Sequence, residues 1–248
     1  MPASISSVLA VFAHPDDESL LAGGVLARFA AAGVRTAVIA MTWATDSPRA
    51  AELADAVREL GVGEARMLGY GDARNPAAAP GRPRLVDADP DEVVGALVRH
   101  VRELRPDVVV THDAVGQLTG HPDHRRTHQL TVLAVQEAAS ARRHPGAGAP
   151  WRASAVYCAT HPESGVGALG PLLKGVGKDV LAVPDVDVTT VVDVTPFLER
   201  KWAAILAHRG EVARERSLPG LLARLPEGAR DEIIGTEYFT RLAPGPAH

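Results

Sequence analysis

The densest group of chemically versatile residues is the motif HPDDE at residues 14–18, which follows an apolar run over residues 8–13. Its three carboxylates come directly after a segment expected to be a buried strand, and such charges are costly unless a cation offsets them. His14 and Asp17 are three residues apart, so the first turn of a helix points both side chains the same way. One imidazole nitrogen and one carboxylate oxygen can then bind the same divalent ion.

Asp16 has a different place in this motif. On helical geometry it lies about 100° around the axis from Asp17, so it need not bind the same ion and can stand beside it as a base. A simpler interpretation is open at this point, in which Asp16 or Asp17 caps the helix and His14 is a packed histidine at a strand end. A third ligand elsewhere in the chain would favour the metal site.

A second histidine pair, His121 and His124, has the same three-residue spacing within the motif HPDH. This motif follows an apolar run over residues 107–111 and precedes a helical pattern, so it repeats the layout of the first motif. Because the C-terminal ends of parallel strands lie at one edge of a sheet, we expect the two motifs to meet there. Two histidines and one aspartate with an open position are typical of catalytic zinc sites.

Together, the two motifs resemble those of the PIG-L (LmbE-like) family of zinc-dependent N-acetylglucosamine deacetylases. The resemblance implies that zinc is bound by His14, Asp17 and His124. It also implies that Asp16 is the general base, and that His121 polarises the carbonyl group or assists the leaving group. Zinc is the expected metal, although iron, cobalt or manganese would also suit these ligands.

The resemblance covers residues 7–160 most clearly. In the family, the loop after the third strand contacts sugar hydroxyls, which makes Asp72 and Arg74 candidate substrate-binding residues. A solvated surface pair is an equally simple interpretation of these two. Asp123, between the two histidines, is expected to cap the helix that follows, to hold the ring of His121 as its carboxylate partner, or to do both.

The elements that must position these motifs alternate between strands and helices. Expected strands cover residues 6–13, 35–41, 64–68, 107–111 and 153–159, and expected helices cover residues 18–32, 49–60, 90–105 and 124–142. This alternation predicts an α/β, Rossmann-like fold with a mostly parallel sheet and helices on both faces. A less regular C-terminal region follows.

In that region we expect a long glycine-rich loop over residues 160–184, a helix over residues 196–208 and a last strand over residues 237–242. The segment GVGALG at residues 165–170 matches a dinucleotide-binding fingerprint. That fingerprint should directly follow a strand and open a helix, whereas here Pro171 comes at once. A mobile loop over the site is therefore the favoured interpretation.

Two departures from the family pattern bear on function. After a segment ending at His208 the family usually continues with Ser-Gln, whereas this chain continues with Arg209, Gly210 and Glu211. Mycothiol-conjugate amidases carry a lysine shortly after the first motif, where this chain has SLLA at residues 19–22. We therefore expect removal of an N-acetyl group from an N-acetylglucosamine-type conjugate. An amidase on a non-sugar or thiol-conjugate amide, and a non-catalytic sugar- or nucleotide-binding protein on the same fold, are the alternatives.

Length and composition set the remaining bounds. The 248 residues, 46% of them hydrophobic, predict a single domain over residues 1–248, with a core over 1–160 and a C-terminal part over 161–248 that completes the substrate site. The net charge of −4 gives no basic field for nucleic acid. Cys158 is the single cysteine, and no apolar run is long enough to span a membrane. The expected partner is a small amino-sugar conjugate and the expected location is the cytoplasm, with the oligomeric state left open.

Overall fold

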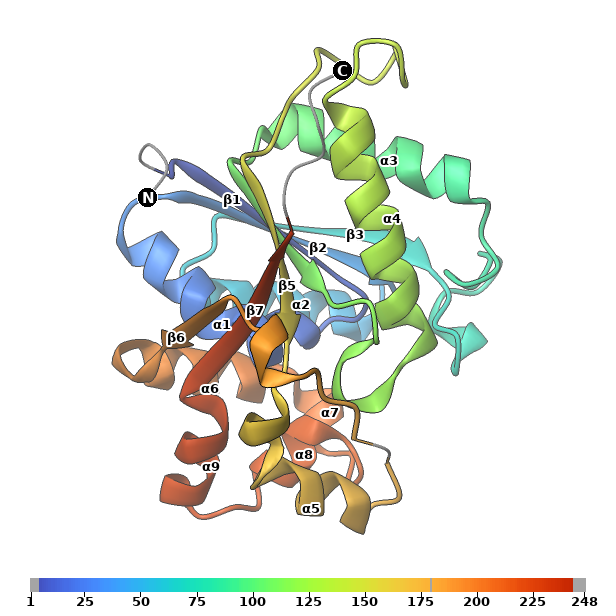
Figure 1. Ribbon diagram of the computed structural model, residues 1–248. Coiled ribbons are helices and arrows are strands. Elements are labelled where there is room, and N and C mark those ends of the chain that lie inside the picture. Colours follow the sequence, from blue (N-terminus) through green and yellow to red (C-terminus); the bar gives the residue numbers. More distant parts are fainter. Residues whose placement is uncertain (1–4, 179, 243–248) are drawn as a thin grey trace.

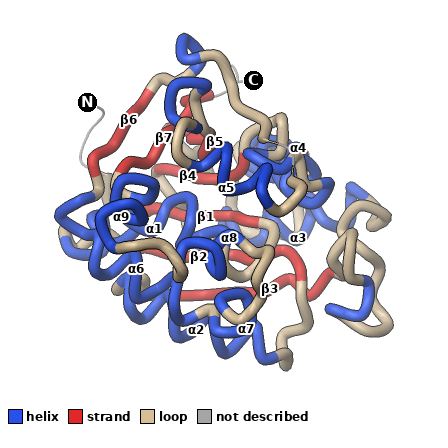
Figure 2. Tube along the Cα trace, turned by 90° about the horizontal axis from the view of Figure 1, so that it is seen from below, coloured by secondary structure: helices blue, strands red, loops and turns tan. Residues whose placement is uncertain are grey.

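A seven-stranded sheet forms the centre of the computed structural model, which describes residues 5–178 and 180–242. Its strands are β1 Ser7–Phe12, β2 Arg35–Thr42, β3 Glu64–Tyr70, β4 Val108–His112, β5 Ala155–Thr160, β6 Thr190–Asp193 and β7 Thr236–Leu242. Figure 2 shows their order, β3-β2-β1-β4-β5-β7-β6. Strands β1 to β5 pair in parallel, whereas β7 is antiparallel to β5 and β6. The mostly parallel sheet expected from the sequence is confirmed.

Helices cover both faces of this sheet (Figure 1). On one face lie α3 Pro90–Leu104 and α4 Pro122–Ala138, and on the other lie α1 Asp17–Ala31, α2 Pro48–Leu60 and α6 Leu198–Ala207. Successive residues of a strand point to opposite faces. In β1, Leu9 and Val11 accordingly join the core beneath α3 and α4, while Ala10 and Phe12 join the core beneath α1 and α2. The buried run in the sequence reflects a strand covered on both sides.

The two motifs meet because of the strand order. β1 pairs with β2 on one side and with β4 on the other, so the order of the chain reverses between β1 and β4. Ligands of open α/β sheets bind at the carboxyl ends of strands at such a reversal. HPDDE directly follows β1, and HPDH follows β4 after a short 3-10 turn, Gln117–Thr119. The sheet therefore brings both motifs to the same edge.

Helix α4 is shorter than the sequence predicted. It ends at Ala138, and residues 139–142 form a turn instead of continuing the helix. The buried guanidinium of Arg102 donates hydrogen bonds to the carbonyl oxygens of Glu137, Ala138 and Ser140. A side chain from α3 thus satisfies carbonyls at the end of α4, which no local pattern in the sequence reveals.

The glycine-rich stretch over residues 160–184 is not the long loop that we expected. It contains a 3-10 turn, Glu163–Val166, and the helix α5 Leu169–Gly175. Leu169 and Leu173 lie four residues apart and bury their side chains in a cluster with Leu118 and Leu221. Burial of one apolar face stabilises this short helix despite its glycines. The fingerprint-like residues 165–170 run from the turn into α5 and follow no strand directly.

The rest of the C-terminal region consists of short helices around the last strands. These helices are α7 Arg209–Val212, α8 Leu218–Leu222 and α9 Glu227–Ile234. The helix expected over residues 196–208 and the last strand are confirmed as α6 and β7. Every helix in the described ranges is too short or too polar to traverse a lipid bilayer.

Candidate active site

Three side chains from the two motifs converge at the edge of the sheet. His14 Nδ1 lies 3.2 Å from Asp17 Oδ2 and 3.3 Å from His124 Nε2, and the latter atom lies 3.3 Å from Asp17 Oδ1. Ligands bound at about 2.0–2.1 Å to a tetrahedral zinc ion lie roughly 3.3 Å from one another. Both the spacing and the donor types of His14, Asp17 and His124 therefore fit a metal ion.

Other residues with suitable atoms surround this group. Within the described ranges, potential ligands form three overlapping groups, which are His14/His121/His124, Asp17/His112/His124 and His14/Asp72/His121/Asp123. Each of these groups shares at least one residue with the first three. His112 Nε2 already accepts the Ala13 backbone N–H at 3.0 Å, which argues against His112 as a ligand.

Two carboxylates hold the far side of the His14 ring. His14 Nε2 lies 3.2 Å from Asp72 Oδ2 and 3.2 Å from Asp123 Oδ2, while Nδ1 faces Asp17. Burial alone lowers the pKa of His14, but the hydrogen bonds to Asp123, Asp17 and Asp72 outweigh it and raise that pKa well above the usual value. A carboxylate on the non-ligating nitrogen commonly orients a metal-binding histidine. Asp72 and Asp123 are placed for that task.

The surroundings of Asp123 differ from both expectations. His121, and not Asp123, is the N-cap residue of α4. The Asp123 carboxylate lies 3.8 Å from His121 Nδ1, farther than its 3.2 Å distance from His14 Nε2. Its backbone N–H donates a hydrogen bond of 3.2 Å to His121 Nδ1. The carboxylate therefore faces His14 more closely, and the main chain of Asp123 orients His121.

His121 is held as a neutral imidazole. Burial, followed by the neighbouring His14 and His124, lowers its pKa to about 2. Because Nδ1 accepts a backbone N–H, the single ring proton of the neutral form is at Nε2. His121 is thus a hydrogen-bond donor and a poor Brønsted acid.

Asp16 occupies the N-cap position of α1, but its side chain makes no capping hydrogen bond. Its φ of +138° is unusual for a residue with a Cβ, and such backbone strain costs on the order of 1–3 kcal/mol. Burial raises the pKa of Asp16 to about 7, with further contributions from Asp17 and Glu211, while Arg49 opposes the shift. A carboxyl group with such a pKa suits a general base near neutral pH.

Each carboxylate of the first motif meets a cationic or imidazole partner from another element. Asp16 Oδ1 lies 3.4 Å from Arg49 Nη2 of α2, and Asp17 lies among the imidazoles described above. Glu18 Oε1 lies 2.7 Å from His208 Nε2, and both side chains are fully buried. These contacts supply the compensation that three consecutive acids, two of them buried, require. They also place His208, whose role the sequence left open, directly behind the site.

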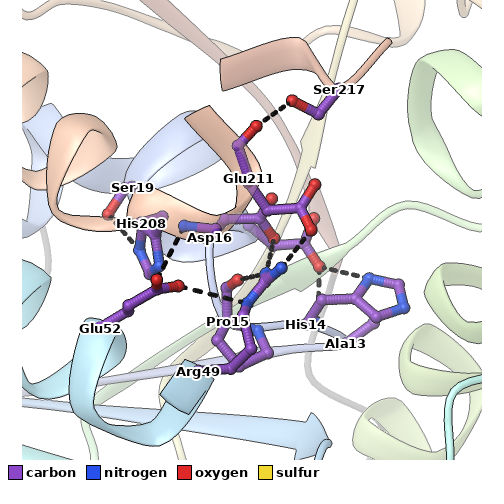
Figure 3. Close-up of polar contacts among 12 residues, drawn as sticks. Ala13, His14, Pro15, Asp16, Ser19, Arg49, Glu52, His208, Glu211 and Ser217 are labelled. Atoms are coloured by element: carbon purple, nitrogen blue, oxygen red, sulfur yellow. Dashed lines mark hydrogen bonds and ion pairs between the residues drawn. The ribbon is translucent and has the colours of Figure 1, made fainter. Parts of the chain in front are cut away.

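Arg49 and Glu211 are the site residues that sequence analysis missed. The Arg49 guanidinium is almost buried and donates hydrogen bonds to the Pro15 carbonyl oxygen and to the Glu211 carboxylate (Figure 3). It also stacks over the Trp43 ring, 4.9 Å from the ring centre. In sequence, Arg49 is an ordinary residue in the first turn of a helix, and Glu211 is 162 residues away. The only local signal was that α2 begins after a short loop at the C-terminal end of β2.

The candidate ligands and Asp16 line a cavity of about 680 Å³. Asp72 and Arg74 lie on the same wall, where Asp72 also accepts the backbone N–H groups of Arg74 and Asn75 at 2.6 and 3.0 Å. The C-terminal region supplies the opposite wall, through Gly177, Lys178, Glu211, Arg214, Arg216, Ser217, Leu218 and Pro219. A cavity of this volume accommodates a small-molecule ligand.

Comparisons with known proteins point in the same direction. Residues 9–135 match the family model described as "PIG-L: GlcNAc-PI de-N-acetylase". The chain is 38% identical over 266 residues to a 1D-myo-inositol 2-acetamido-2-deoxy-alpha-D-glucopyranoside deacetylase of Rhodococcus opacus (strain B4). That match covers 94% of this chain and 90% of the relative.

Solved structures share the fold. N,N'-diacetylchitobiose deacetylase from Pyrococcus horikoshii has a TM-score of 0.67 at 21% identity, over 97% of this chain and 85% of its own. GalB, the 4-carboxy-2-hydroxymuconate hydratase from Pseudomonas putida KT2440, has a TM-score of 0.64 at 22% identity, over 98% and 99%. Proteins named for different reactions thus share this fold, so the reaction must be argued from the site.

Proposed function

The chain belongs to the PIG-L family, and on that premise we propose that it is a metal-dependent N-deacetylase acting on an N-acetylglucosamine-type sugar conjugate. One observation carries the proposal most directly. The partly buried carboxylate of Asp16, which makes no capping hydrogen bond, lies beside a convergent group of metal-ligand atoms in a cavity large enough for a sugar. The R. opacus relative, named as a deacetylase of an acetamido sugar joined to inositol, supports the substrate class.

His14, Asp17 and His124 would hold the metal, for which we propose zinc. A zinc ion with an open position supplies a Lewis acid, which lowers the pKa of a bound water and polarises a carbonyl oxygen. The donor set of two imidazoles and one carboxylate fits this ion. Asp72 and Asp123 would keep the His14 ring oriented toward it.

The remaining steps are carried by the side chains of this protein. Asp16 accepts a proton from the attacking water as the new C–O bond forms at the acetamide carbon. His121 donates its Nε2 proton in a hydrogen bond to the carbonyl oxygen as negative charge develops there. When the C–N bond breaks, Asp16 returns its proton to the departing amine, which gives acetate and the free amino sugar. Because His121 Nδ1 accepts the Asp123 backbone N–H, its Nε2 proton is available for the polarising role.

Asp72 and Arg74 remain proposed substrate residues, with different parts to play. Arg74 is exposed on the cavity wall and can reach a sugar or its aglycone, whereas Asp72 is buried and already engaged with His14. The opposite wall comes from the C-terminal region, which supports the proposal of one domain. The two ends of the proposed interval, residues 1–248, lie outside the described residues.

The alternative functions have less support. A sugar- or nucleotide-binding protein without turnover has no need of a strained, uncapped carboxylate beside a metal site. An amidase on a non-sugar or thiol-conjugate amide would suit the same catalytic groups. Three relatives that are 35–38% identical to this chain are named as deacetylases of an acetamido sugar.

The decisive experiment measures acetate release from a panel of acetamides. The panel holds the acetamido-glucosyl inositol of the R. opacus relative, N,N'-diacetylchitobiose, N-acetylglucosamine and a non-sugar acetamide. Each compound is incubated with chelator-treated protein and with the same protein after zinc is restored. We expect zinc-dependent release from a sugar conjugate. Release from the non-sugar amide alone, or no release by protein with one bound metal per chain, would refute the sugar deacetylase.

A further inference from the structure

Two strained residues flank the candidate site, and one side chain contacts both. Asp16 follows β1 with a φ of +138°, and Trp43 follows β2 with a φ of +76°. Such conformations persist only where surrounding contacts enforce them. The Arg49 guanidinium stacks over the Trp43 ring, donates to the Pro15 carbonyl oxygen and lies 3.4 Å from Asp16 Oδ1. Arg49 therefore contacts both strained residues and the peptide before Asp16.

Glu211 holds the other end of this guanidinium. Arg49 Nη1 donates to Glu211 Oε1, while Nη2 donates to Pro15, so the two ends of the planar fork are engaged in opposite directions (Figure 3). Glu211 is itself fixed, because Ser217 Oγ donates to its backbone carbonyl oxygen. Its side chain is almost buried. A forked guanidinium with both ends occupied has little freedom to turn.

The distance between Arg49 and Asp16 shows that this arrangement prevents a close ion pair between them. At 3.4 Å, Asp16 Oδ1 and Arg49 Nη2 make an ion pair that is longer than a charge-assisted hydrogen bond. Without the Glu211 carboxylate, two anions are left to this guanidinium, Asp16 at 3.4 Å from Nη2 and Glu52 at 3.8 Å from Nε, and Asp16 is the nearer. The guanidinium would then turn from Pro15 toward Asp16 and occupy the oxygen that a base needs.

We propose that Glu211 is a positioning residue for Asp16, acting through Arg49. It draws the guanidinium away from the carboxylate and onto the Pro15 carbonyl oxygen, which keeps Asp16 strained, uncapped and open to the cavity. This inference rests on the proposed function, in which Asp16 is the base. It gives the C-terminal region a defined part in the chemistry, because Glu211 acts through Arg49 and not by contact with a reacting atom.

The structural alternative is that Glu211 only docks α7 onto α2, and the chain offers a matched control for it. Arg209 of α7 and Asp55 of α2 form a second ion pair between the same two helices, at 3.1 Å. Asp55 is partly exposed and Arg209 largely so, and neither lines the cavity. Asp55→Ala therefore removes an α2–α7 ion pair without touching Arg49, Pro15 or Asp16.

The kinetic experiment compares metal-loaded wild type with Glu211→Ala, Glu211→Gln, Arg49→Lys, Glu211→Ala/Arg49→Lys and Asp55→Ala. We expect Glu211→Ala to lower kcat at least tenfold, with KM and bound metal within twofold of wild type. Glu211→Gln keeps an acceptor oxygen and should recover kcat to within threefold. Asp55→Ala should stay within twofold. Arg49→Lys should lose kcat at least tenfold, and the double variant should lose no more than Arg49→Lys alone.

Several results would overturn the inference. Equal losses in Glu211→Ala and Asp55→Ala would show that helix docking is the whole effect. Multiplicative losses in the double variant would show that Glu211 does not act through Arg49. If Glu211→Ala does not fold, Arg49→Lys carries the test, because α7 keeps its Asp55–Arg209 contact there, and wild-type kcat in that variant counts against the proposal.

A structural readout separates this inference from the proposed function. In a crystal structure of Glu211→Ala without added metal, the distance from the Arg49 guanidinium to Asp16 should shorten and its hydrogen bond to Pro15 should be lost. Unchanged positions of Arg49 and Asp16 would overturn the positioning role. Absence of deacetylase activity in the wild type would count against the proposed function alone, since the crystallographic comparison does not depend on turnover.

Discussion

Residues 7–160 and residues 161–242 contribute to the candidate site in different ways. The first region supplies every proposed metal ligand together with Asp16 and His121, all of them directly after sheet strands or at helix starts. The second region supplies the opposite cavity wall and the partners Glu211 and His208. In Figure 1 its helices α5, α7, α8 and α9 gather at one end of the sheet, next to the strand ends that carry the motifs. The sheet places reactive groups, and the later region orients them.

The apolar cores of the two regions also differ, in their size. Large apolar clusters cover both faces of the sheet and bury its central strands completely. The short C-terminal helices pack in two smaller clusters, one around Leu173 and one around Ile205. Helix α6 and strand β7 of the later region also join the large cluster beneath α1 and α2, and the polar contacts Glu18–His208 and Arg49–Glu211 add to this attachment. We expect changes in the first region to abolish chemistry, and changes in the second to alter orientation or stability.

Metal removal should have the largest effect. A chelator should reduce acetate release to background, and zinc should restore it, because the proposed reaction needs the metal that His14, Asp17 and His124 would hold. His124→Ala should copy the chelated state and bind less than one metal per chain, measured by mass spectrometry. His100→Gln, on α3 outside the cavity, serves as the histidine control and should keep its metal. Full activity in protein shown to contain no metal would contradict the proposed metal-dependent reaction.

Asp16→Asn should come next. It removes the base but leaves the three proposed ligands, so kcat should fall roughly 10²–10⁴-fold while bound metal stays near one per chain. Acetate release and metal content measured on the same sample check both parts. If the variant turns over like the wild type, the base must be sought elsewhere in the cavity.

The first region could largely be predicted from sequence because its signals are local. Buried apolar runs alternate with helical patterns, and each catalytic motif spans only a few residues after a strand. Parallel pairing then forces these strand ends to one edge. Even here, the end of α4 was misplaced, because it depends on Arg102 from another helix.

The second region resisted prediction because its determinants are distant in sequence. Helix α5 lies in a glycine-rich stretch and is stabilised when Leu169 and Leu173 meet Leu118 and Leu221. His208 contacts Glu18, which is 190 residues away in sequence, and Glu211 accepts a hydrogen bond from Arg49, which is 162 residues away. No spacing rule within one segment indicates such pairs. The site was therefore predicted as a set of reactive residues, and the contacts that orient them emerged only from the structure.

A buried pair in the second region should affect stability and leave catalysis unchanged. Lys201 Nζ lies 2.8 Å from Glu237 Oε1 and donates to the Ile234 carbonyl oxygen, with both side chains almost fully buried. Lys201→Met leaves an uncompensated carboxylate and should lower the free energy of unfolding by about 3–5 kcal/mol. The backbone N–H groups of Gly24 and Val25 still donate to Glu237, which favours the lower end of that range. Urea unfolding measures the loss.

The same variant sharpens the division between the regions. Neither Lys201 nor Glu237 lines the catalytic cavity, so kcat per metal-loaded molecule should remain within twofold of wild type. Glu237→Gln keeps the shape of the partner and should destabilise the protein through the same pair. A large fall in kcat at full folding would mean that the later region controls chemistry more widely than through Glu211.

The smallest effect should come from Arg74, on the cavity wall of the first region. Its guanidinium is exposed and makes no hydrogen bond or ion pair with another described residue, so its removal should not disturb the site. Arg74→Ala should raise KM about fivefold with kcat unchanged, a loss of roughly 1 kcal/mol of uniform binding. Asp72→Asn makes the contrast, because Asp72 holds His14 and should instead weaken metal binding roughly 10–100-fold. If Arg74→Ala lowers kcat and leaves KM unchanged, Arg74 stabilises the transition state. The residues of the first region that take part in catalysis would then include one on the cavity wall.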